Sequence, residues 1–128
     1  MENEQQELLF KLSVFEQQIR QLQQQTGSID EGIVELESLF VGLDEMKSSE
    51  GKESFSPIGR GIFVKSKILS EDLLVDVGGR NFVKKSVSET QDVIKKQIEK
   101  LEEIRKDLNN NLFEIGKEAE KLIGKVGS

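Results

Sequence analysis

Apolar residues recur at alternating steps of three and four positions along two stretches of about 40 residues each. This spacing is typical of the a/d seam of a coiled coil, in which one stripe of a helix packs against a second helix. The first series is Leu8, Leu12, Phe15, Ile19, Leu22, Thr26, Ile29, Ile33, Leu36, Phe40 and Leu43. The second series is Val87, Gln91, Ile94, Ile98, Leu101, Arg105, Leu108, Leu112, Ile115, Ala119, Leu122 and Val126. A helix of about 40 residues is about 60 Å long, so little of the chain is left to enclose a pocket.

Local signals mark where the two helices begin and end. The segment Ser86-Val87-Ser88-Glu89 fits a capping box, in which Ser86 is the N-cap and Glu89 reaches back to it. A polar run that ends in Gly51 favours a stop after the first series. We therefore expect helices over about residues 4–47 and 86–124, within one domain that spans residues 1–128.

The two seams match each other if the helices run antiparallel. Pairing residues whose numbers sum to 134 joins Leu8 to Val126 and Leu43 to Gln91, and every layer then combines an a with a d position. Two interpretations are open for the polar seam residue Arg105. It fixes the register at some cost in stability, or it extends to solvent while Ile104 fills the seam.

The segment between the helices has the signals of short strands. Four runs, at residues 55–58, 61–68, 73–77 and 81–84, are rich in Val, Ile, Leu and Phe and are separated by Gly-containing turns. The motif Gly-x-x-x-Phe-Val-Lys occurs twice, from Gly59 and from Gly78. Two β-hairpins over about residues 53–85 explain this pattern, so the fold class is α+β. Isolated hairpins are marginal in water and their edges invite pairing, so we expect other subunits to complete the sheet.

Composition argues against catalysis. The chain contains no Cys or His, which removes thiol nucleophiles, the usual metal ligands and the usual general base. We therefore expect no enzyme activity, no metal site and no cofactor. The 18 basic and 24 acidic residues are mixed along the helices without a basic block, so nucleic acid is not an expected partner. No apolar run is long enough to span a membrane, and the acidic start lacks a signal-peptide pattern, so we expect a cytoplasmic protein.

A helix, two β-hairpins and a returning helix, with Pro57-Ile58-Gly59-x-Gly61-x-Phe63-Val64 and Val75-Asp76-Val77-Gly78-x-x-x-Phe82-Val83 between them, resemble the α class of prefoldin subunits. The resemblance implies a hexamer of two α and four β subunits, built on a β-barrel formed by the hairpins. It also implies an ATP-independent chaperone that captures non-native proteins at free coiled-coil tips and passes them to a group II chaperonin. Arg60 and Arg80 depart from the family pattern, because small residues are common at both positions.

The resemblance assigns roles to apolar residues outside the seam. Clustered near the free tip are the expected client-binding residues Leu9, Phe10, Val14, Phe113 and Ile123. Expected in the barrel and its subunit interfaces are Ile62, Phe63, Val64, Val75, Val77, Phe82 and Val83. For Leu9 and Phe10, fraying of the helix end or contact with the paired helix is an open alternative to client binding. The rival to a chaperone is a structural coiled-coil adaptor or filament-forming protein that binds one folded partner.

Overall fold

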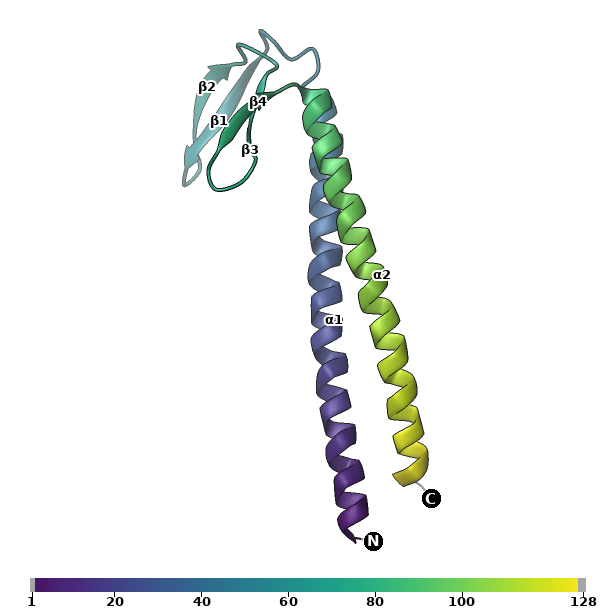
Figure 1. Ribbon diagram of the computed structural model, residues 1–128. Helices are drawn as coiled ribbons and strands as arrows, with labels where there is room; N and C mark the ends of the chain where they lie inside the picture. The colour runs from purple at the N-terminus through teal and green to yellow at the C-terminus, as the bar shows by residue number, and fades with distance from the viewer. Residues whose placement is uncertain (1, 127–128) are drawn as a thin grey trace. The chain divides into compact units, whose positions relative to one another are not determined.

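The computed structural model describes residues 2–126 and contains two long helices with four short strands between them. The elements are α1 (Glu2–Asp44), β1 (Glu53–Gly59), β2 (Ile62–Lys67), β3 (Leu73–Asp76), β4 (Phe82–Lys85) and α2 (Val87–Val126) (Figure 1). The expected α+β class is therefore confirmed. Contacts divide the chain into two compact units, residues 1–34 with 99–128, and residues 35–98. Within the described residues, no helix is long and apolar enough to cross a membrane.

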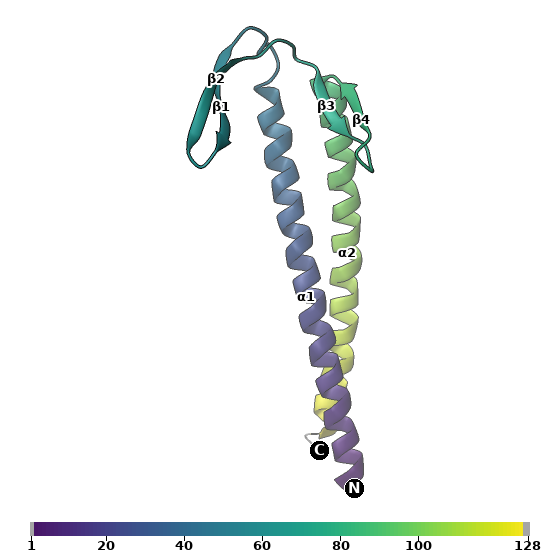
Figure 2. The same cartoon turned by 90° about the vertical axis from the view of Figure 1, so that its left-hand side faces the viewer.

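The first unit is an antiparallel pair of helical segments. The start of α1 and the end of α2 lie together (Figures 1 and 2). Every residue of the two three-four series is buried or half-buried, whereas nearly all intervening positions are exposed. The Arg105 guanidinium donates to the Asp30 carboxylate at 3.2 Å. Asp30 follows Ile29, which is the expected partner of Arg105. Gly32 lies close to Leu101, because a Cβ atom added to Gly32 would be 3.4 Å from the Leu101 side chain. The expected partner of Leu101 is Ile33, the residue that follows Gly32. These contacts agree with the register expected from the sequence.

The second unit has its apolar cluster where the helices meet the strands. Leu43, Val87 and Ile94 are buried there, and Phe40 and Leu73 pack against them. Because Leu73 belongs to β3, one face of the second hairpin is fixed to the helices, and the side chains of β3 alternate between half-buried and exposed. This docking gives the β3–β4 hairpin support that two isolated strands lack.

The capping box is confirmed at the start of α2. The Glu89 N–H donates to the Ser86 hydroxyl at 3.1 Å, and the Ser86 N–H donates to the Glu89 carboxylate at 3.4 Å. The end of α1 differs from the expectation, since the helix ends at Asp44 rather than near Lys47. Beyond Asp44 the backbone hydrogen bonds tighten to three-residue steps as far as Lys47. Ser48 has a φ of 63° and donates its N–H to the Glu71 carboxylate, so the helical periodicity ends there.

The four expected strands form two separate antiparallel hairpins (Figure 2). In the first, Pro57 faces Phe63 and Gly59 faces Ile62, which leaves Ile58 as a bulge. Its two loop residues, Arg60 and Gly61, have φ values of 48° and 79°. Positive φ at both central residues is typical of a type I′ turn, which matches the twist of the strands.

The loop of the second hairpin also has positive φ at both central residues, with glycine and arginine in the reverse order. Gly79 and Arg80 have φ values of 60° and 64°, and the Asn81 N–H closes the turn on the Gly78 carbonyl at 3.1 Å. The Gly78 N–H donates to the Asp76 carboxylate, which orders the entry to the loop. Each hairpin tip therefore holds an arginine in a left-handed conformation that L-residues other than Asn and Asp seldom adopt.

Candidate functional site

Two groups of exposed apolar side chains form the candidate functional surfaces. Only five apolar residues within 2–126 are buried, so one chain covers little of its own hydrophobic surface. A monomer normally exposes no contiguous apolar patch larger than about 300–600 Å². We call the two groups the tip residues (Leu9, Phe10, Val14, Phe113 and Ile123) and the hairpin residues, which are defined below.

All five tip residues are exposed, but they do not form one patch. The heptad places Leu9 and Ile123 at e positions, and e positions of antiparallel partners share one flank of the coiled coil. Phe10 and Val14 are one turn apart on the outer face of α1, where Phe10 is 71% exposed and Val14 36%. These four residues surround one end of the coiled coil.

Phe113 lies apart from the other tip residues. It is ten residues from Ile123 along α2, which corresponds to about 15 Å. The Lys117 ammonium lies 4.4 Å from the centre of its ring, so the exposed ring is partly covered by a cation–π contact. The structure thus brings together four of the five tip residues and separates Phe113 from them.

The hairpin residues are nine large apolar side chains that are 44–69% exposed. They are Phe55, Ile58, Ile62, Phe63, Val64, Leu74, Val77, Phe82 and Val83. At roughly 90 Å² each they expose roughly 800 Å², which is what one partner contributes to a standard protein interface. The area is divided between two separate hairpins and both of their faces, since Phe63 and Val64 lie on opposite faces of β2. So much exposed apolar surface on two short hairpins favours cover by partner chains.

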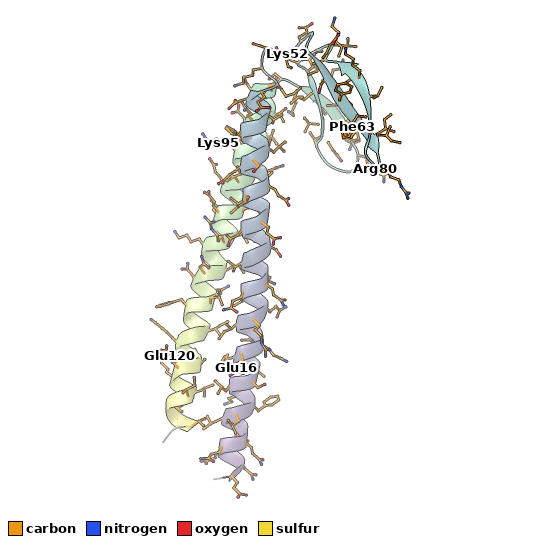
Figure 3. All side chains as sticks on the ribbon, turned by 180° about the vertical axis from the view of Figure 1, so that it is seen from behind. Glu16, Lys52, Phe63, Arg80, Lys95 and Glu120 are labelled. Atoms are coloured by element: carbon orange, nitrogen blue, oxygen red, sulfur yellow. The ribbon has the colours of Figure 1, made fainter. Side chains whose placement is uncertain are left out.

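The sequence identified six of these nine residues and also Val75. Val75 is only half-buried, on the same face of its hairpin as Leu73. Phe55, Ile58 and Leu74 were not among the expected interface residues, although each belongs to an expected strand. Phe55 is on the same face of the first hairpin as Phe63, which is labelled in Figure 3. Strand alternation from Phe63 could have found Phe55, because residues that face each other share a face.

Polar groups in the seam hold the helices in register. Gln91 is 6% exposed, and its amide donates to the Phe40 carbonyl at 3.0 Å and to the Asp44 carboxylate at 2.8 Å. This hydrogen bond and that of the Lys47 ammonium lower the pKa of Asp44. Arg105 pairs with Asp30 while Ile104 remains 45% exposed, so the interpretation in which Ile104 fills the seam is wrong.

The described residues contain no cluster of three or more metal-ligating side chains. Gly59-Arg60-Gly61 forms a turn between antiparallel strands and does not begin a helix. It therefore lacks the helix N-terminus with which phosphate loops bind nucleotides. The exposed groups of residues 2–126 are suited to binding other protein chains.

Comparisons with known proteins agree with this architecture. The family model described as prefoldin subunit matches residues 15–125. The prefoldin subunit alpha of Methanobrevibacter smithii is 30% identical over 123 residues, which cover 95% of this chain and 80% of that protein. The prefoldin subunit alpha of Methanococcus vannielii is 28% identical over 127 residues, which cover 98% and 86%. The cryo-EM structure of a filamentous PFD from Methanocaldococcus jannaschii matches 88% of this chain and 95% of that chain, with a TM-score of 0.78 and 26% identity.

Proposed function

The chain belongs to the prefoldin family as a chaperone subunit of the alpha class, and we propose that it captures non-native proteins at its tip residues without ATP. In this proposal the chain works in the cytoplasm inside a hexamer of two alpha and four beta subunits. The hexamer passes captured proteins to a group II chaperonin. The prefoldin family is a family of chaperones, which fits a protein that performs no catalysis.

The observation that carries the proposal is the exposure of apolar side chains at the end of the coiled coil. Leu9 and Phe10 are more than half exposed, although the seam beside them is complete with Leu8 and Leu12. Exposed apolar groups that the fold does not need favour an interaction surface. Unfolded proteins expose apolar side chains of many shapes, so a helix end that offers aliphatic and aromatic groups suits them without requiring a matched pocket.

The hairpin residues support assembly. Their exposed area corresponds to one full interface per chain, and the open edges of both two-stranded sheets can pair with strands of other subunits. Several coiled coils held on one body bring several tips to one client. Weak contacts at each tip then act together, because every contact after the first is intramolecular.

The test changes Leu9, Phe10 and Val14 together to Ser in the complex with the beta-class partner. Scaling burial energies of about 1.5–3 kcal/mol per side chain by the exposed fractions of Leu9, Phe10 and Val14 gives an upper limit of about 5 kcal/mol per tip. We expect the complex to keep its mass and melting temperature, while its suppression of the aggregation of a denatured test protein falls markedly. The beta subunits carry their own tips, so the measurement uses beta subunits with truncated coiled-coil ends. Unchanged suppression in that background would contradict the assignment of the tip residues.

A second candidate function is a filament-forming structural protein. It is favoured by one observation, since the matched PFD of Methanocaldococcus jannaschii is filamentous. Electron microscopy of the purified chain, alone and with its beta-class partner, separates the candidates. A closed particle of uniform mass that suppresses aggregation supports the chaperone, and long filaments that ignore denatured proteins support the structural role.

A further inference from the structure

The middle of one flank of the coiled coil lacks the charges that normally border a seam. Positions e and g of coiled coils usually carry Glu and Lys, which pair between helices. In the middle of the first unit, the g positions of α1 are Gln18, Gln25 and Gly32, and those of α2 are Ile104 and Asn111, none of which is charged. Charged g positions, at Lys11 of α1 and Glu118 of α2, lie beyond this stretch toward the chain termini.

The opposite flank of the same helices is charged. Its e positions include Asp30 and Glu102, and the ion pair between Asp30 and Arg105 lies on that side. In this middle stretch the charges at e and g positions are therefore confined to one side of the coiled coil, and we call its uncharged g side the neutral flank.

Two adjoining grooves follow the neutral flank, with volumes of about 360 and 540 Å³. They share Gln21 and Gln25 and so form one continuous depression, which we call the neutral groove. Half-buried seam side chains form its floor, namely Leu22, Ile29, Leu108 and Ile115. Five amides form most of its walls, namely Gln18, Gln21, Gln24, Gln25 and Asn111.

The wall amides are exposed, and within residues 2–126 none of the five has a hydrogen-bond partner. A carboxamide is the chemical equivalent of a peptide group, because it carries N–H donors and a carbonyl acceptor without charge. From Gln18 to Ile29 the groove is about 17 Å long, which is the length of about five residues of extended chain. Glu114, at one end, is the only charged side chain that lines it.

From this chemistry we infer that the neutral groove binds the main chain of an extended, non-native polypeptide. The wall amides bond to backbone N–H and C=O groups, and the apolar floor with Ile104 receives small side chains. Backbone groups are common to all sequences, so this contact is independent of sequence, in contrast to the apolar contacts of the tip residues. A folded, charged helix does not suit the groove, because the groove offers neither counter-charges nor a wide apolar stripe. The inference rests on the proposed chaperone function and adds a second contact zone to it.

The test compares two variants of the assembled complex that carry equal added charge. In the groove variant, Gln18→Glu and Gln25→Glu place carboxylates on the neutral flank. In the control, Gln17→Glu and Gln23→Glu place the same charges at f and e positions of the same helix. The probe is a fluorescein-labelled, uncharged ten-residue peptide of Val, Ser and Thr. A second version of the peptide has methyl groups on alternate backbone nitrogens.

We expect the groove variant to bind the plain peptide about tenfold more weakly than the unmodified complex, since a carboxylate covered by a neutral peptide lacks a partner. The control should change binding by less than about twofold. The methylated peptide should bind weakly to every complex, because half of its N–H donors are gone. Equal binding by both variants, equal binding of both peptides or no binding by the unmodified complex would overturn the inference.

Two further readouts separate the alternatives. A loss of native mass in the groove variant alone would make the neutral groove an interface between subunits, which also overturns the inference. The Ser variant at the tips is measured in parallel for suppression of aggregation. If that variant loses suppression while the groove variant matches its control, the chaperone function stands and only the groove assignment fails.

Discussion

The substitution Phe63→Asp tests whether the hairpin residues build the assembly. Phe63 is 58% exposed on β2, opposite Pro57 and on the same hairpin face as Phe55. Covering this exposed part of the ring removes roughly 110 Å² from water, which is worth about 3 kcal/mol at 25 cal/mol per Å². The substitution removes that contribution and also places an unpaired carboxylate in the interface.

An unpaired charge in an interface costs several kcal/mol more. A total of about 5 kcal/mol weakens each affected contact by more than about a thousandfold, so an assembly held at nanomolar affinity should dissociate at micromolar concentration. The helices lose no seam contact, because Phe63 does not belong to either seam series. We therefore expect native mass spectrometry to show loss of the complex, and circular dichroism to show helicity close to that of the unmodified chain.

Ser54→Asp is the matched control for this substitution. Ser54 is exposed on the other face of the same hairpin, which also carries Val64, but it lies at the polar end of that face, where it pairs with Ser66. It receives the same charge without loss of apolar area, and we expect an intact complex. An intact complex with Phe63→Asp would refute the role of this face. Dissociation by both substitutions would show that charge anywhere on the hairpin is enough, which would also refute the argument from area.

The remaining predictions concern the polar layer where α1 ends. Gln91→Ala removes two hydrogen bonds from a buried position and should lower the free energy of unfolding by about 1–3 kcal/mol. The measurement is the melting temperature, which should fall. An unchanged melting temperature would show that water replaces the amide without loss. The hydrogen bond from Gln91 and the ammonium of Lys47 lower the pKa of Asp44 in the folded chain. The ionised carboxylate therefore stabilises the fold fully at pH values above the pKa of Asp44 in the unfolded chain. This stabilisation is lost as the pH falls through the lower pKa of the folded chain. The Asp44 contribution should therefore begin to fall near pH 4 and disappear only below the folded pKa. An NMR titration should find a higher pKa for Asp44 in Gln91→Ala than in the unmodified chain, and equal values would contradict the assigned cause.

The parts of the fold that follow local periodicity were predictable from the sequence. The three-four spacing from Leu8 to Leu43 identified the seam because coiled-coil contacts repeat with the helix itself. The capping box at Ser86 and the paired Gly-x-x-x-Phe motifs were equally local. The antiparallel register followed from matching a to d positions, and the contact of Gln91 with Phe40 and Asp44 agrees with it.

Features that depend on tertiary contacts or turn geometry were less accessible. The end of α1 at Asp44 was missed because shorter backbone steps continue the same apolar spacing. The left-handed conformations of Arg60 and Arg80 follow from the tight hairpins, which override the preference of arginine for negative φ. The tip residues were expected as one cluster, but helix rise separates Phe113 from the rest. The neutral groove had no signal in the apolar periodicity, because its walls are uncharged amides outside the seam.

The central claim is that this chain works as a chaperone subunit inside a hexamer. The most direct measurement is native mass spectrometry of the chain mixed with its beta-class partner, before and after addition of a permanently unfolded polypeptide and without ATP. We expect one dominant species of two alpha and four beta subunits that gains the mass of the polypeptide. A stable monomer, or a hexamer that does not gain this mass, would contradict a chaperone role in a hexamer.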